Sequence, residues 1–179
     1  MIWYLGYGSN LSRARFASYV EGGTPAGASR TYAGCRDRTP PSATRSMTVP
    51  GLLTFAGEST VWGGGMAFLD PDGDGEVHGR AYLVADGQLA DVAEQEPRYE
   101  AQTVVAEHDG LPVVALTSTA DHPAAAPSAT YLRTILAGLT DGVLTRELAV
   151  DYLLAAPGVD LLWDRASIEA LEQPGTPAG

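Results

Sequence analysis

A glycine-rich turn, Gly6-Tyr-Gly-Ser-Asn10, holds the first residues of the chain that are suited to chemistry. Its two glycines allow the backbone to approach a ligand closely, and successive N–H groups in such a turn can point toward one place. A cluster of N–H donors of this kind binds a carboxylate or stabilises a developing oxyanion. The alternative is an ordinary turn that ends a strand, which the local composition alone favours.

Glu96 is the second candidate, because it stands just before Pro97 at the end of a predicted helix. Leu89, Val92 and Glu96 follow at positions i, i+3 and i+7, so the spacing predicts that they share one face. If that face is buried, desolvation raises the pKa of the Glu96 carboxyl, which suits a general base or acid near neutral pH. The alternative is a partly exposed glutamate at the fraying end of a helix.

The elements that must position the turn lie on both sides of it. Ile2–Leu5 is β-branched, aromatic or aliphatic and predicts a buried strand that directs the turn. Ser12 is predicted to cap a helix over Arg13–Val20. Residues 22–48 are rich in Gly, Pro, Ser, Thr and Arg, so we expect an irregular loop with a strand near Ser29–Gly34, and we expect this loop to border the site.

The middle of the chain has the pattern of strands. Leu52–Phe55, Val61–Leu69 and Glu76–Ala85 are strand-like, and Asp70–Gly75 is predicted to be a hairpin turn between the last two. The three aspartates of that turn also match the opening of a calcium-binding EF-hand loop. Ala81 stands where the loop needs its bidentate glutamate, so the hairpin is preferred.

Further helices and strands are predicted in the second half of the chain. Asp86 is expected to cap the helix that ends at Pro97. The other predicted elements are a hairpin of Ala101–Glu107 and Leu111–Thr117 around His108–Gly110, a helix over Thr130–Leu139 capped by Ser128, and a helix from Thr145 to Pro157.

Composition predicts one domain and a cytoplasmic protein. The chain has 179 residues, 45% of them hydrophobic, and we assign residues 1–173 to a single domain and 174–179 to a flexible tail. Cys35 is the only cysteine, so no internal disulfide can form, and we interpret it as structural rather than catalytic. No stretch has the length of an apolar membrane span and no secretory leader is evident, so we expect a cytoplasmic location.

Charge limits the classes of partner. The formal net charge is −11, which disfavours nucleic acid and anionic membranes as partners. All basic residues are arginines, and six of them fall within residues 1–50 against Glu21 and Asp37. This segment is able to steer a small anion, although a solvated surface is the simpler interpretation. The three histidines lack the spacing of metal ligands, so no metal is expected.

Tyr4-Leu-Gly-Tyr-Gly-Ser-Asn-Leu11 resembles the signature of the γ-glutamylcyclotransferase-like family, which also includes γ-glutamylamine cyclotransferases and a biosynthetic deprotecting enzyme. Three later segments fit the same family, namely Gly64-Gly-Met-Ala-Phe-Leu69, His78-Gly-Arg-Ala-Tyr-Leu-Val84 and Pro127-Ser-Ala-Thr-Tyr131. The resemblance covers nearly the whole chain. It implies an α+β fold, a small mixed β-barrel with flanking helices, and no cofactor.

The resemblance also implies which residues act. Glu96 matches the family's catalytic glutamate, and the residues matching its substrate-binding positions are Tyr4, Leu5, Gly6, Tyr7, Gly8, Ser9, Asn10 and Tyr131. Two positions depart from the family pattern. Pro97 stands where glycine is expected, and a second pocket tyrosine, expected on the strand before Tyr131, is replaced by Ala115 or Thr117.

The implied reaction is an intramolecular acyl transfer on a small γ-glutamyl compound. The α-amine attacks the γ-carbonyl, which gives 5-oxoproline and releases an amine or amino acid, with Glu96 as general acid and base. Three alternatives remain open: the same chemistry on a γ-glutamylamine or a γ-glutamyl-protected biosynthetic intermediate, a non-catalytic binding protein on this scaffold, and a serine hydrolase using Ser9. The last lacks a nucleophile elbow and an identifiable histidine partner. The sequence leaves the oligomeric state unknown.

Overall fold

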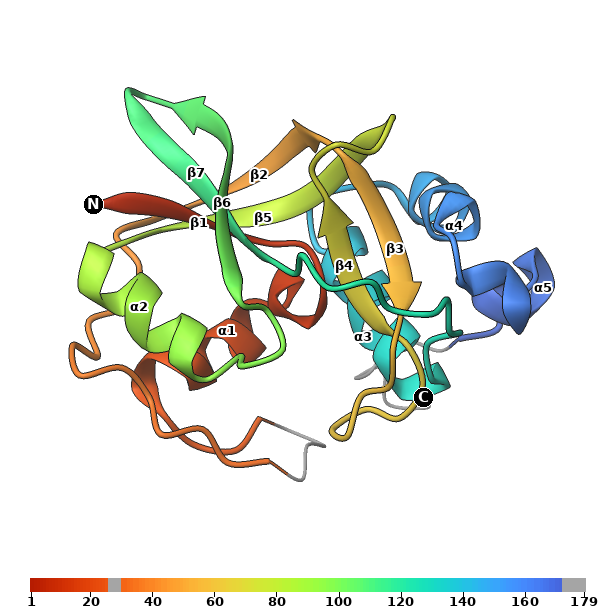
Figure 1. Ribbon diagram of the computed structural model, residues 1–179, viewed down its shortest axis with the longest axis horizontal. Helices are drawn as coiled ribbons and strands as arrows, with labels where there is room; N and C mark the ends of the chain where they lie inside the picture. The colour runs from red at the N-terminus through yellow and green to blue at the C-terminus, as the bar shows by residue number, and fades with distance from the viewer. Residues whose placement is uncertain (26–29, 172–179) are drawn as a thin grey trace, which may run out of the picture.

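The computed structural model describes residues 1–25 and 30–171 and has an α+β fold (Figure 1). The predicted tail, residues 174–179, lies outside the described residues, as does Ser29, the first residue of the predicted strand near Ser29–Gly34. In that segment the structure has a single antiparallel bridge, between Gly23 and Tyr32.

A five-stranded mixed sheet forms the centre of the molecule. Its order is β2 (Ala43–Pro50), β5 (Glu76–Val84), β1 (Ile2–Gly6), β7 (Leu111–Thr117) and β6 (Ala101–His108). β1 is antiparallel to β5 and parallel to β7. The predicted apolar strand at the start of the chain is therefore confirmed as the middle strand, and the glycine-rich turn begins where that strand ends.

β3 (Leu52–Ala56) and β4 (Met66–Asp70) pair with each other in a separate two-stranded sheet. The described strands thus form two sheets and no closed barrel, whereas the α+β class with flanking helices is confirmed. The turn Asp70–Gly75 is confirmed as a turn, but the predicted hairpin is wrong because the turn passes from one sheet to the other.

β4 begins later than the predicted strand Val61–Leu69. Gly63 and Gly64 have φ angles of 71° and 65°, in the left-handed region that interrupts a strand. Trp62 consequently lies in a loop before β4.

β2 begins inside the segment that was predicted to be an irregular loop, residues 22–48, and ends two residues beyond it. It pairs with β5 from Ala43 opposite Leu83 to Pro50 opposite Glu76. Only Val49 among its residues is buried, so the strand lacks the alternating apolar pattern that would have revealed it.

Two of the three predicted helix caps are confirmed. Ser12 and Ser128 each accept a hydrogen bond from a backbone N–H in the first turn of their helix, and so does Thr145, which was predicted to be the first residue of its helix. Asp86 is instead the first residue of its helix, because the Gln88 side chain accepts a hydrogen bond of 2.9 Å from the N–H of Ala85. The helices are η1 (Ser9–Leu11), α1 (Arg13–Glu21), α2 (Asp86–Glu94), α3 (Ala129–Thr140), α4 (Arg146–Ala155), η2 (Val159–Leu161) and α5 (Arg165–Glu169).

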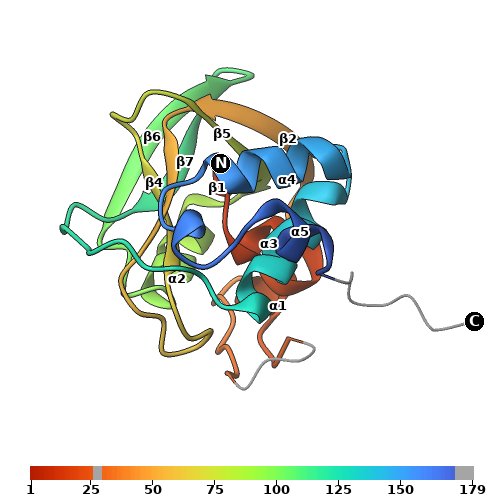
Figure 2. The ribbon, with the colours of Figure 1, turned by 90° about the vertical axis from the view of Figure 1, so that its right-hand side faces the viewer.

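The five-stranded sheet separates two apolar clusters. Along β1, Tyr4 belongs to the cluster that contains residues of α1 and α2, while Trp3 and Leu5 belong to the one that contains residues of β3, β4, α3 and α4. Figure 2 shows α3, α4 and α5 together on one side of the molecule.

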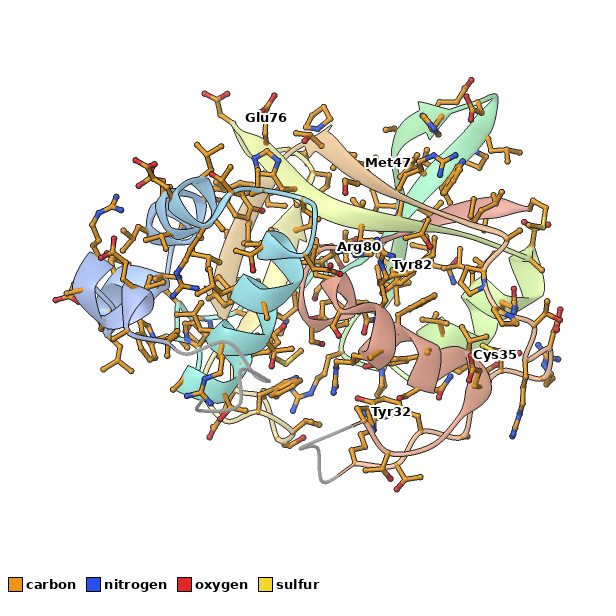
Figure 3. The ribbon with its side chains drawn as sticks, turned by 180° about the vertical axis from the view of Figure 1, so that it is seen from behind. Tyr32, Cys35, Met47, Glu76, Arg80 and Tyr82 are labelled. Carbon is orange, nitrogen blue, oxygen red and sulfur yellow. The ribbon has the colours of Figure 1, made fainter. Side chains whose placement is uncertain are left out.

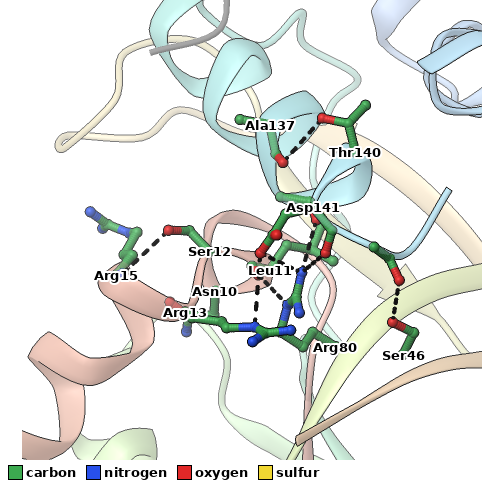
Figure 4. A network of polar contacts seen from close by, with 12 residues as sticks. Asn10, Leu11, Ser12, Arg13, Arg15, Ser46, Arg80, Ala137, Thr140 and Asp141 are labelled. Atoms are coloured by element: carbon green, nitrogen blue, oxygen red, sulfur yellow. Dashed lines mark hydrogen bonds and ion pairs between the residues drawn. The ribbon is translucent and has the colours of Figure 1, made fainter. Parts of the chain in front are cut away.

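Arg80 on β5 holds the turn after β1 in place. Its side chain is 1% exposed, and its Nε donates a hydrogen bond of 2.7 Å to the carbonyl of Leu11. Its Nη2 donates to the Gly138 carbonyl and pairs with the Asp141 carboxylate at 3.0 Å, which ties the turn to the end of α3 (Figure 4). Tyr82, two residues along β5, donates a 2.8 Å hydrogen bond to the Asn10 carbonyl; Figure 3 labels both side chains on this strand.

Replacing Arg80 by methionine is expected to destabilise the fold. The change leaves buried carbonyl oxygens without donors, so we expect a loss of about 3 kcal/mol in the free energy of unfolding, measured by urea denaturation. Arg45→Met on the exposed strand β2 is the control, with an expected change within about 0.5 kcal/mol. A loss below about 1 kcal/mol for Arg80→Met would show that these carbonyls do not depend on Arg80.

Candidate active site

A small cavity at the end of β1 brings most of the predicted site residues together. Its volume is about 30 Å³, and it is lined by Tyr4, Tyr7, Gly8, Ser9, Asn10, Glu96, Tyr99, Leu116 and Tyr131. Glu96 and six of the eight predicted binding residues are in this set. We call this space the inner cavity.

Leu5 and Gly6 do not line the inner cavity. Leu5 is fully buried in the apolar core. Gly6 packs against the turn so closely that a Cβ atom there would lie 2.8 Å from the Asn10 carbonyl oxygen. Both residues support the shape of the turn, and neither faces the cavity.

Gly8 keeps the inner cavity open. A Cβ atom at this position would lie 3.0 Å from the hydroxyl oxygen of Tyr131 and 3.4 Å from the Cβ of Ala67. The Tyr131 hydroxyl accepts a hydrogen bond of 3.3 Å from the N–H of Ala67, and its ring stacks on Trp62 with centroids 5.0 Å apart. The position of the Tyr131 hydroxyl is therefore fixed by contacts on two sides.

Asn10 presents an unused acceptor. Its Nδ2 donates a hydrogen bond of 2.9 Å to the hydroxyl of Tyr4, while its buried Oδ1 has no hydrogen-bond partner among the described residues. A buried acceptor without a donor is costly. The amide oxygen is thus available to a ligand that carries an N–H group.

Glu96 stands just beyond the end of α2. The predicted helix reached this residue, but the structure ends the helix at Glu94, with Gln95 as its C-cap. The Gln95 side chain donates a 3.0 Å hydrogen bond to the Tyr19 carbonyl, which anchors the segment to α1. The carboxylate of Glu96 accepts a hydrogen bond from the Tyr19 hydroxyl.

Burial raises the pKa of the Glu96 carboxyl above its ordinary value. The hydrogen bond from Tyr19 opposes that rise, and so do the positive charges of Arg15 and Arg30. The net effect is a pKa of the Glu96 carboxyl above that of an exposed glutamate. Glu96 lines the inner cavity, as expected of an inward carboxylate, although it does so from the turn after α2 and not from a shared helix face.

A chain of hydrogen bonds links Glu96 to a buried arginine. The hydroxyls of Tyr19 and Tyr32 are 3.0 Å apart, and Nη2 of Arg15 donates to the Tyr32 hydroxyl at 2.5 Å. The Tyr19 hydroxyl has one hydrogen, and in the hydrogen bond to Glu96 it donates that hydrogen. The Tyr32 hydroxyl is then the donor in the hydrogen bond between the two tyrosines. All three donors then point along the chain toward the carboxylate, an arrangement that stabilises its ionised form.

A second space, the outer cavity, continues from the inner one past Glu96. Its volume is about 120 Å³, and Ser9, Glu96, Tyr99 and Tyr131 line both spaces. Residues that line only the outer cavity include Arg15, Tyr19, Arg30, Tyr32, Trp62 and Arg98. The carboxylate of Glu96 consequently faces both cavities, which allows it to exchange protons with groups in either one.

Several site residues were missed by sequence reasoning. Arg15, Tyr19 and Tyr32 belong to no motif. The one available signal is that Arg15, a charged residue, lies on the buried face of the helix. Tyr99 follows Glu96 by three residues and lines the cavity. Its hydroxyl donates a hydrogen bond of 2.8 Å to the Ala67 carbonyl.

The strand before Tyr131 contributes Leu116 to the lining of the inner cavity, whereas Ala115 and Thr117, the positions considered for the second pocket tyrosine, are not in that lining. The Leu116 carbonyl accepts a 2.6 Å hydrogen bond from the Tyr7 hydroxyl. Tyr7, which was predicted, and Tyr99, which was not, supply aromatic walls of the inner cavity.

Cys35 is not suited to act as a nucleophile. The buried Cys35 thiol donates to the Tyr19 carbonyl at 3.3 Å, and burial raises its pKa to about 11, which supports a structural role.

Residues 1–25 and 30–171 contain no group of three or more His, Cys, Asp or Glu side chains that could hold a metal ion. Within the same residues, no helix is both long enough and apolar enough to cross a membrane.

Solved structures share this fold at low sequence identity. An uncharacterized protein from Homo sapiens matches with a TM-score of 0.59 and 19% identity, covering 99% of this chain and 92% of that one. A structure of gamma-glutamyl cyclotransferase matches over the same shares with a TM-score of 0.57 and 19% identity. YkqA from Bacillus subtilis matches 87% of this chain and 55% of its own length, with a TM-score of 0.55 and 17% identity. The chain therefore has the γ-glutamyl cyclotransferase-like fold, as the sequence resemblance implied.

Sequence comparisons add less. No family model matches the chain. Histone deacetylase 5 from Arabidopsis thaliana is 37% identical over 99 residues, which are 53% of this chain and 15% of that protein. Because the match covers so small a part of the deacetylase, it carries no inference about deacetylation.

Replacing Tyr19 by phenylalanine is expected to raise the pKa of Glu96 further. The change removes the hydrogen bond that favours the ionised carboxylate, while the desolvation that raises the pKa remains. Carbon-13 NMR titration of the Glu96 carboxyl measures the shift without any need for a substrate. Tyr152→Phe, on α4, is the control and leaves the Glu96 pKa unchanged. A downward shift or no shift in Tyr19→Phe would contradict this account of the site.

Proposed function

We propose that this protein cyclises γ-glutamyl compounds to 5-oxoproline with release of an amine. The α-nitrogen forms a bond to the γ-carbon, and the bond from that carbon to the leaving nitrogen breaks. The α-ammonium loses two protons as it becomes the lactam N–H, and the leaving nitrogen gains both and departs as an ammonium group. The observation that carries this proposal is the position of Glu96. Its carboxylate, with a raised pKa, faces the inner cavity beside the turn of η1 and also faces the outer cavity.

The inner cavity offers polar partners for one end of a γ-glutamyl group whose remainder extends into the adjoining outer cavity. The first N–H groups of η1 have no acceptor within that short helix, and Gly8 provides no side-chain cap. In the proposed complex these N–H groups hold the α-carboxylate or the oxyanion that develops on the γ-carbonyl. Donors in such positions contribute about 3 kcal/mol each to the stabilisation of a transition state.

Asn10 orients the α-amine and Glu96 takes its proton. The unpaired Oδ1 of Asn10 accepts a hydrogen bond from the substrate nitrogen and orients it. Glu96 takes the proton that must leave before the nitrogen can attack, and a pKa above that of an exposed carboxyl makes it a stronger base. It then gives this proton to the leaving nitrogen in the outer cavity, and it passes on in the same way the second proton that the α-nitrogen loses when it becomes the lactam N–H. Because nucleophile and electrophile are in one molecule, holding the substrate folded is itself a large part of the catalysis.

Glu96→Gln is expected to fold normally and to lose turnover. Glutamine keeps an oxygen acceptor for Tyr19 but cannot take a proton, so 5-oxoproline release should fall by about 100-fold or more. The measurement is chromatographic detection of 5-oxoproline from a panel of γ-glutamyl amino acids and γ-glutamyl amines. Glu94→Gln, at an exposed position on α2, is the control and keeps wild-type rates. Loss of activity in Glu94→Gln with retention in Glu96→Gln would reject the assignment, and ligand binding without turnover by the wild type would favour a binding protein.

The pH dependence of kcat/KM offers a separate check. Glu96 must be ionised to act as base, so kcat/KM is expected to fall as the pH drops through a pKa raised above the ordinary 4.5. Full activity at or below pH 4.5 would contradict a base with a raised pKa.

A further inference from the structure

The outer cavity is positively charged although the chain as a whole is acidic. Arg15, Arg30 and Arg98 line it, with Glu96 as its only acidic residue among those described. A groove of about 610 Å³ adjoins it through Arg15 and Trp62, and Arg13 and Arg133 line that groove. Five of the eleven arginines thus line these two spaces. Of the 22 acidic residues, only Glu96 and Asp141 are in the described lining of the same two spaces. This concentration of charge favours an anion.

Arg15 is a buried cation that has no carboxylate ion pair among the described residues. Its side chain is 5% exposed, and its guanidinium lies 4.4 Å from the centre of the Trp62 ring. Nε donates to the Ser9 hydroxyl at 2.9 Å, and Nη2 donates to Tyr32. A guanidinium group has more N–H donors than these two bonds use. A buried charge held in this way is stabilised when an anion binds to its remaining donors.

Arg30 lines the same cavity, and its guanidinium lies near the same tyrosine ring as that of Arg15. Its guanidinium lies 4.9 Å from the centre of the Tyr32 ring, and that of Arg15 lies 5.4 Å from it. Nη2 of Arg30 donates a 2.7 Å hydrogen bond to the Gln95 carbonyl, next to Glu96. Both arginines are therefore held in place before a ligand arrives, which reduces the entropy cost of binding.

We propose that Arg15 and Arg30 determine specificity by binding a carboxylate carried by the amine that is released. This inference rests on the proposed function and assigns the outer cavity to the leaving group. Glu96 must reach the leaving nitrogen, and Arg15 is joined to Glu96 through the hydroxyls of Tyr19 and Tyr32. The bound carboxylate accordingly lies close to that nitrogen, as in an α-amino acid. Plain alkylamines lack the anion, and cationic amines are repelled by the arginines.

A matched pair of substrates tests the inference. γ-Glutamyl-alanine and γ-glutamyl-alaninamide have nearly the same size and differ in the charge of the carboxyl group. We expect the wild type to favour the carboxylate by about tenfold or more in kcat/KM. Arg15→Gln and Arg30→Gln should each lose most of that preference, mainly through KM for the carboxylate, whereas Arg45→Gln on β2 keeps it. Equal kcat/KM for the two compounds with the wild type would overturn the inference.

Binding separates this inference from the proposed reaction. Calorimetry with Glu96→Gln measures the affinity for the same two compounds without turnover, and Arg15→Gln introduced into that background should remove the preference for the carboxylate. If the wild type releases no 5-oxoproline but still binds the carboxylate more tightly through Arg15, the reaction fails and the anion site stands. Equal binding of the pair, or binding of neither, overturns the anion site. The half-buried Arg30 provides the same test if Arg15→Gln does not fold.

Discussion

The balance of forces on one carboxylate governs this site. Burial raises the pKa of the Glu96 carboxyl, because it disfavours the charged form. The hydrogen bond from the Tyr19 hydroxyl and the charges of Arg15 and Arg30 lower it, so the pKa of this group depends on its neighbours on both sides. The aromatic residues, the arginines and the short segment after α2 are all arranged around that carboxylate.

The fold supplies the two sides of the cavity from opposite faces of the sheet. Glu96 follows α2, which packs with α1 on one face, and Tyr131 comes from α3 on the other. β1 ends between them, and the turn that follows it is fixed from β5 by the hydrogen bonds that Arg80 and Tyr82 donate to its carbonyls. A rigid sheet thereby determines the position of a turn whose glycines would otherwise leave it free to move.

Local patterns predicted the strand Ile2–Leu5 and the helices capped by Ser12 and Ser128, because each depends on neighbouring residues. Glu96 does line the cavity, but from the turn after α2 and not from the helix face that its spacing predicted. β2 escaped prediction because its exposed side chains show no pattern and its strand is defined by pairing with β5. The turn Asp70–Gly75 has local hairpin chemistry, yet tertiary pairing sends its two strands to different sheets. The link from Arg15 to Glu96 joins three separate segments, so no spacing in the sequence could reveal it. The resemblance to a known family supplied the fold but not these contacts.

The central claim is that the substrate attacks itself, and isotopic labelling by solvent tests that most directly. A γ-glutamyl amino acid that the protein consumes is incubated in water enriched in oxygen-18, and the products are analysed by mass spectrometry. Intramolecular attack keeps the original carbonyl oxygen, so the account predicts unlabelled 5-oxoproline in an amount equal to the released amine. Glutamate carrying oxygen-18 in its γ-carboxyl group would show that water is the nucleophile, and would contradict the role assigned to the substrate α-amine.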